Sequence, residues 1–175
     1  MAASSSSSSL GRLGFVGCGT IASSLVEGLC ALPLEKRRKW LPHKLVLSPR
    51  GQSNSTRLQK AFPDLVKVVE HNQAVIDASD TVFLALTPQH AREAIEPLVF
   101  RPQQTAVSLM HGVSPESIQT MPQTGPGEVV RVNPLPAIAH HQGIAAMAPP
   151  HPQLAEMLGL LGPVSGYGQF HAIAH

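Results

Sequence analysis

Short apolar runs recur along the chain, and each is bounded by residues typical of turns. These runs predict β-strands at 13–16, 45–47, 66–69, 81–86, 105–109, 129–132 and 144–147. Helical spacing or helix-start residues lie between them, at 20–32, 53–62, 74–78, 90–98, 114–121 and 152–161. Strand and helix therefore alternate, which is typical of βαβ units and a mainly parallel sheet.

The character of two segments supports an α/β class with helices on both faces of the sheet. Residues 81–86 are apolar without alternation, as expected of a central strand that is buried on both sides. Ser114, Pro115 and Glu116 supply an N-cap residue, a first-turn proline and an early acid, which together predict a helix start. The pattern therefore predicts a doubly wound fold.

Size and composition limit the number of domains and the classes of partner. The 175 residues suit one domain, which we place at 12–175 after a disordered Ala/Ser-rich segment at 1–11. The net charge of +2 excludes a strong nucleic-acid footprint, and we expect no nucleic-acid or membrane partner. The basic run 36–39 is interpreted as a solvated loop or helix end. Two cysteines and no secretory signal favour a reducing, cytoplasmic location.

A glycine turn between the first strand and the first helix predicts a dinucleotide site. Gly17 permits a tight turn, Gly19 lets the backbone approach a pyrophosphate, and Ala22 lets the helix pack closely on the strand. The phosphates would meet free N–H groups and the positive end of the helix dipole. Glycine pairs also occur in turns that bind nothing, so the context of strand and helix matters.

The end of the second predicted strand favours NADP(H) over NAD(H). An NAD site usually has an acidic residue there for the ribose hydroxyls, whereas this chain has Ser48 and Arg50. Ser48 could donate to the 2′-phosphate, and the Arg50 guanidinium could pair with it or lie along the adenine. The alternative for Arg50 is an ordinary surface arginine in a turn.

Five segments in order resemble pyrroline-5-carboxylate reductases: 14–22, 45–50, Asn72, 79–89 and 108–112. The resemblance covers 12–161 and implies a Rossmann-like domain that binds NADP(H), with hydride transfer to the C=N bond of a small cyclic imine in proline biosynthesis. It also implies three groups of cofactor-binding residues. They are Gly17, Gly19, Thr20 and Ile21 for the pyrophosphate, Ser48, Arg50 and Asn72 for the adenosine end, and Ala85, Leu86, Thr87 and Pro88 for the nicotinamide ribose.

The sequence also departs from that family. Thr87 stands where the family usually has lysine, His111 stands where it has a small residue, and 131–136 is shorter than the family's segment. His111 could donate a proton to an imine nitrogen or bond a backbone carbonyl as a structural residue. No catalytic residue is assigned, and the nine histidines lack ligand spacing, so we expect no metal site.

The sequence is compatible with three functional hypotheses. The first is an NADPH-dependent oxidoreductase of a small imine or carbonyl substrate, working as a homodimer or with a segment supplied by another chain. The second is a non-catalytic NADP(H)-binding module. The third is a fragment of a reductase, because the family continues into a helical dimerisation domain that we do not find before His175.

Overall fold

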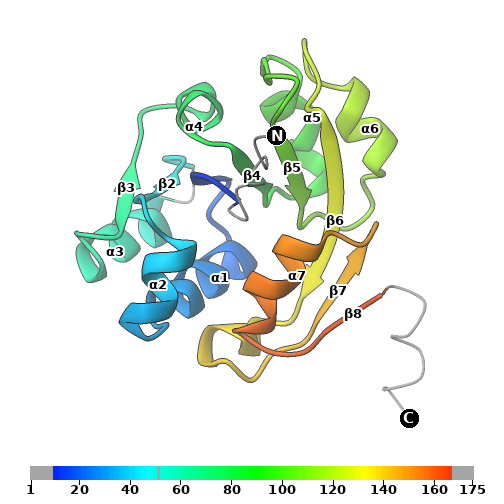
Figure 1. Ribbon diagram of the computed structural model, residues 1–175. Coiled ribbons are helices and arrows are strands. Elements are labelled where there is room, and N and C mark those ends of the chain that lie inside the picture. Colours follow the sequence, from blue (N-terminus) through cyan, green and yellow to red (C-terminus); the bar gives the residue numbers. More distant parts are fainter. Residues whose placement is uncertain (1–9, 51, 167–175) are drawn as a thin grey trace, which may run out of the picture.

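The computed structural model describes residues 10–50 and 52–166, which form one twisted sheet with helices on both faces (Figure 1). The strand order is β3-β2-β1-β4-β5-β6-β7-β8. The strands are β1 (Leu13–Val16), β2 (Leu45–Leu47), β3 (Val66–Val68), β4 (Thr81–Leu84), β5 (Thr105–Ser108), β6 (Glu128–Pro134), β7 (Ala145–Ala148) and β8 (Val164–Gly166). Neighbouring strands are parallel except for the antiparallel pair β6 and β7. The predicted doubly wound α/β fold is confirmed.

The helices divide between two apolar cores, one on each face of the sheet. They are α1 (Thr20–Cys30), α2 (Leu34–Trp40), α3 (Gln52–Ala61), α4 (Asn72–Ala78), α5 (Pro88–Ile95), α6 (Pro115–Thr120), α7 (Pro152–Gly159) and the 3₁₀ helix η1 (Pro136–His140). Apolar side chains of α1, α2, α3 and α7 pack on one face, where Phe15 and Phe83 stack with ring centroids 4.6 Å apart. Those of α4, α5 and α6 pack on the other face.

The order of the strands creates a reversal point beside β1. The chain winds from β1 outward to β2 and β3, and then returns to add β4 on the opposite side of β1. Because these strands are parallel, the loops after β1 and β4 leave the sheet at the same carboxyl edge. Ligands of open α/β sheets bind at such an edge, next to the reversal point.

Three local features differ from the sequence expectation. The helix α2, which follows α1 after a short turn, was not predicted as a separate element, and the basic run 36–39 lies toward its end, which is one of the two positions expected for it. The short strand β8 and the helix η1 were not predicted. Leu10 is buried and its carbonyl oxygen accepts a hydrogen bond from the Thr81 hydroxyl at 2.7 Å, so ordered chain begins before residue 12. The rest of the predicted disordered segment, 1–9, lies outside the described residues.

Candidate functional site

The turn after β1 and the loop after β4 are in direct contact. Gly17 has a φ of +88°, which favours glycine, and a Cβ atom there would lie 2.4 Å from the carbonyl oxygen of Ala85. The same atom would lie 3.0 Å from the side chain of Leu86. Two of the predicted groups, the pyrophosphate turn and the nicotinamide-ribose loop, therefore lie side by side.

Ser48 contacts the glycine turn rather than facing solvent. It follows β2, is fully buried, and its hydroxyl oxygen accepts a hydrogen bond from the Gly17 N–H at 2.8 Å. We expected this hydroxyl at the 2′-phosphate, on the outer side of the site. The structure shows Ser48 holding Gly17, and its expected contact with a 2′-phosphate stays a prediction.

Asn54 is a site residue that sequence reasoning missed. It lies near the start of α3, and its side-chain amide donates a hydrogen bond to the Cys18 carbonyl oxygen at 2.9 Å. In the sequence it is one of several small polar residues at a helix start, at 52–56, and nothing there separates it from its neighbours. The contact depends on tertiary structure, because 36 residues separate the two partners.

Gly19 forms an open cradle at the start of α1. Its φ of −76° suits any residue, and a Cβ atom on it would meet no protein atom within 4 Å. Neither backbone conformation nor packing therefore requires glycine here. Gly19 is the N-cap of α1 and provides no side-chain cap, so the first N–H groups of the helix are left for another acceptor. This arrangement fits a phosphate group that approaches the backbone closely.

The charge at the turn is also suitable for an anion. Burial raises the pKa of the Cys18 thiol, which keeps it neutral near physiological pH. A thiolate at this position would repel a pyrophosphate. The first turn of α1 carries no acidic residue, so the positive end of the helix dipole is not neutralised from within the helix.

Arg50 lies at the outer side of the site, where its guanidinium is 3.7 Å from the carboxylate of Glu93 on α5. Both side chains are well exposed, at 48% and 73%. The predicted 2′-phosphate group would meet this guanidinium at the end of β2. Glu93 is a second residue that the sequence did not indicate, since it is an ordinary exposed acid on a helix.

The remaining predicted residues lie at the same edge of the sheet. Asn72 begins α4 after β3, two strands away from β1. Thr87 and Pro88 are exposed at the start of α5, where the Thr87 hydroxyl and His90 Nδ1 share a hydrogen bond of 2.8 Å. Thr20 is exposed and Ile21 is half-buried at the start of α1. His111 is exposed in the loop after β5.

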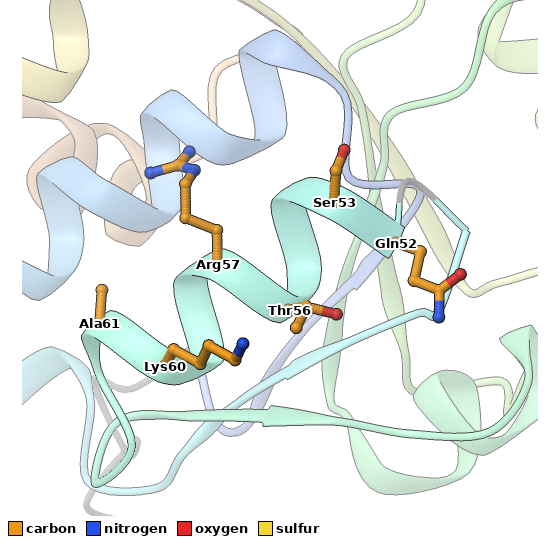
Figure 2. Close-up of a pocket in the computed structure, with 6 residues that line it drawn as sticks. All are labelled: Gln52, Ser53, Thr56, Arg57, Lys60 and Ala61. Atoms are coloured by element: carbon orange, nitrogen blue, oxygen red, sulfur yellow. The ribbon is translucent and has the colours of Figure 1, made fainter.

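A shallow hollow runs along the outer side of α3 (Figure 2). It is lined by Gln52, Ser53, Thr56, Arg57, Lys60 and Ala61. Arg57 points toward α1, where its guanidinium lies 2.5 Å from the Glu27 carboxylate. The hollow follows the helix away from the carboxyl edge, so only its end at Gln52 adjoins the candidate site.

The first strands and their loops match a known protein family. Residues 12–112, more than half of the chain, match the family described as NADP oxidoreductase coenzyme F420-dependent. The chain belongs to this family. The matched part of the chain runs from β1 to the loop after β5, so it contains each segment of the candidate site described above.

Solved structures with the same fold include pyrroline-5-carboxylate reductases. The enzyme from Streptococcus pyogenes is 22% identical with a TM-score of 0.69, over 90% of this chain and 57% of that one. The enzyme from Coxiella burnetii is 19% identical with a TM-score of 0.72, over 94% and 63%. A reductive aminase from Aspergillus terreus in complex with NADPH is 16% identical with a TM-score of 0.63, over 94% and 59%. The resemblance inferred from the sequence is thus confirmed.

The likeness to these solved structures concerns the fold of the chain. The chain has the fold of an NAD(P)-dependent oxidoreductase and spans about three fifths of the length of these solved chains. No curated protein sequence matches it. Within residues 10–50 and 52–166, no helix combines the length and the hydrophobicity needed to cross a membrane. In the same residues, no three His, Cys, Asp or Glu side chains are grouped to hold a metal ion.

Proposed function

We propose that this chain binds NADP(H) at the carboxyl edge of β1, β2 and β4 as the cofactor domain of a reductase of small cyclic imines. The observation that carries the proposal is the cradle at Gly19. Neither backbone conformation nor packing requires glycine at this position, and the missing side chain leaves room at the N-terminus of α1. The structure of a pyrroline carboxylate reductase from Plasmodium falciparum with NADP bound, which has a TM-score of 0.64, supports the choice of cofactor.

Each part of the proposed site would hold one part of the cofactor. Gly17 would shape the turn around the pyrophosphate, and Gly19, Thr20 and Ile21 would bind it through backbone N–H groups. Arg50 would hold the 2′-phosphate and Asn72 the adenosine. The nicotinamide ribose would be held by Ala85, Leu86, Thr87 and Pro88. Ser48 acts on the turn by accepting from Gly17. Bound NADPH supplies a hydride, and the protein's part is to orient and shield the nicotinamide. Thr87 presents a hydroxyl where the related reductases have lysine.

The substrate class rests on the related folds. Pyrroline-5-carboxylate reductases and reductive aminases share this architecture, which supports a small imine or a related carbonyl compound and a role in proline biosynthesis. His111, exposed at the same edge of the sheet, is the candidate proton donor. Two free buried cysteines support a cytoplasmic location, and a homodimer would supply further walls for the substrate.

A non-catalytic NADP(H)-binding module is the second candidate function. The specific observation in its favour is that the loop at Thr87 and Pro88 and the residue His111 are exposed to solvent in this chain. Closed enzyme active sites exclude water around the reacting groups, and exposed residues do not provide such an enclosure. Binding of the cofactor without turnover of any cyclic imine would favour this module over the reductase.

Calorimetric titration with NADPH and NADH tests the cofactor assignment. The wild-type chain is expected to prefer NADPH, and Arg50→Ala is expected to lose about five- to 150-fold in affinity for NADPH with little change for NADH. Arg38→Ala, which removes an exposed arginine from α2, is the matched control for net charge. Absence of binding to either nucleotide would contradict the proposal, and equal affinities would contradict the 2′-phosphate assignment.

A further inference from the structure

Two polar side chains from the β2–α3 region contact the glycine turn, one at a backbone N–H group and the other at a backbone carbonyl oxygen. Ser48 accepts a hydrogen bond from the Gly17 N–H at 2.8 Å, and Asn54 donates one to the Cys18 carbonyl oxygen at 2.9 Å. The first takes away a donor that a phosphate could otherwise use. The second pairs the Cys18 carbonyl oxygen, whose partial negative charge would otherwise have no donor within the turn.

The Asn54 contact sets the direction of a neighbouring donor. The peptide group between Cys18 and Gly19 is planar and trans, so its C=O and N–H point in opposite directions. With the carbonyl oxygen drawn toward α3 by Asn54, the Gly19 N–H is directed away from α3. This N–H belongs to the N-cap residue of α1, at the cradle where a Cβ atom would meet nothing.

Asn54 also lies close in the chain to the residue proposed to bind the 2′-phosphate. It follows Arg50 by four positions and sits in the first turn of α3. A shift of the start of α3 therefore changes both the place of Arg50 and the hydrogen bond to Cys18. The salt bridge between Arg57 and Glu27 is a second contact between α3 and α1, one turn further along α3.

We propose that Asn54 is a positioning residue that couples the 2′-phosphate end of the cofactor site to its pyrophosphate end, by orienting the Cys18–Gly19 peptide group. This inference rests on the proposed NADP(H) site. A dinucleotide that binds Arg50 restricts the motion of the start of α3. Because Asn54 bonds the Cys18 carbonyl oxygen, the orientation of the Gly19 N–H is then restricted as well. The expected consequence is that NADP(H) is bound more tightly than the separate contacts of its two ends would give.

The test separates the two ends of the ligand. Binding of NADPH, 2′,5′-ADP and 2′-AMP is measured by calorimetry or competition for the wild-type chain, Asn54→Ala and Asn54→Asp. We expect Asn54→Ala to weaken NADPH and 2′,5′-ADP by about tenfold and to leave 2′-AMP within about twofold, because 2′-AMP has no group at the glycine turn. Asn54→Asp should weaken the first two further, since its carboxylate faces the Cys18 carbonyl oxygen. The exposed Gln59→Ala on the same helix is the matched control.

The double variant Arg50→Ala with Asn54→Ala measures the coupling itself. We expect its loss of NADPH affinity to be at least about threefold smaller than the product of the two single losses. Multiplicative losses, an equal loss for 2′-AMP, or unchanged binding in Asn54→Ala would each overturn the inference. Thermal unfolding of every variant checks that the fold persists, and Asn54→Ser gives a second variant with a small polar side chain if Asn54→Ala unfolds. Failure of the proposed function itself would show differently, as no binding by the wild-type chain.

Discussion

The guanidinium of Arg50 and the carboxylate of Glu93 lie 3.7 Å apart and connect the region after β2 with α5 after β4. Strand β1 lies between β2 and β4, so this pair spans the end of the strand that carries the glycine turn. Both side chains are substantially exposed, and such pairs are weak because solvent screens them. A 2′-phosphate group brought to Arg50 would compete with Glu93 for it.

Replacing Glu93 by glutamine should therefore strengthen the binding of NADPH. The substitution removes both the competition for Arg50 and the repulsion of the 2′-phosphate, so we expect affinity to rise by about two- to fivefold, with a smaller gain at high salt. The affinity for NADH should stay the same. Glu96→Gln, an exposed acid just after α5, is the control. A fall in NADPH affinity would show instead that Glu93 holds Arg50 in its binding position.

The two glycines of the turn should respond differently to substitution. Gly17→Ala should lower the free energy of unfolding by roughly 1–3 kcal/mol, because φ is +88° and the new Cβ would meet the Ala85 carbonyl oxygen. Gly19→Ser should keep or slightly raise stability, since serine is a better N-cap than glycine. Urea unfolding measures both.

The same Gly19→Ser variant should lose NADPH affinity by about tenfold or more. Its hydroxyl would occupy the cradle and accept the helix N–H groups that a phosphate needs. Calorimetry on the folded variant measures this loss. If Gly19→Ser bound NADPH as tightly as the wild type, the cradle would have no part in cofactor binding.

The fold should lose the stabilisation that ionised Asp80 provides when the pH becomes acidic. The hydrogen bond from Arg12 is the main cause that lowers the pKa of the Asp80 carboxyl group, and the charges of Arg12 and Arg101 act in the same direction. A lowered pKa in the folded state means that the ionised carboxylate stabilises the fold above the ordinary aspartate pKa of about 3.9. This contribution is lost as the pH falls through the folded-state value.

Asp80→Asn is the variant that isolates this effect. It should be less stable than the wild type at neutral pH, and the difference should shrink as the pH falls below about 4. Thermal melts across the acidic range measure the difference. A stability gap that stayed constant down to acid would mean that the Asp80 charge has no part in it.

Both thiols should resist reaction in the folded chain. Burial raises the pKa of Cys30 to about 12 and raises that of Cys18, and the thiolate is the reactive form. A chromogenic thiol reagent at about pH 8 should therefore label the native protein slowly and label both cysteines rapidly after unfolding. Rapid labelling of one thiol before unfolding would show that the turn or the end of α1 opens in solution.

The sequence predicts the parts of this protein that depend on local pattern. The strands β1 to β7 follow from apolar runs, and the glycine turn follows from spacing, because these signals lie in consecutive residues. The extents of strands are less well predicted: residues 85 and 86 continue the apolar run after β4 but leave the sheet and pack near Gly17. The strand β8 consists of Val, Ser and Gly, and it forms because β7 provides a parallel partner.

The details of the site depend on contacts between distant residues. Ser48 was predicted to bind the 2′-phosphate, yet its hydroxyl accepts from Gly17, 31 residues away. Asn54 and Glu93 carry no local signal of their roles. Polar residues near a ligand site are common in sequence, and only the fold decides whether each faces the ligand, the backbone or another side chain.

The contacts at the carboxyl end of α1 affect the position of its amino end at the glycine turn. At the carboxyl end, η1 lies against the helix so closely that a Cβ atom on Gly28 would be 2.6 Å from the Ile138 carbonyl oxygen, and the His141 ring bonds the Gly28 carbonyl at 2.8 Å. Helix α1 is thus fixed at its carboxyl end by η1, while its amino end follows the turn that Ser48 and Asn54 contact. Substitutions in the segment around 136–143, which is outside the matched family region, should therefore shift α1 and change the affinity of the proposed nucleotide site without contacting the ligand.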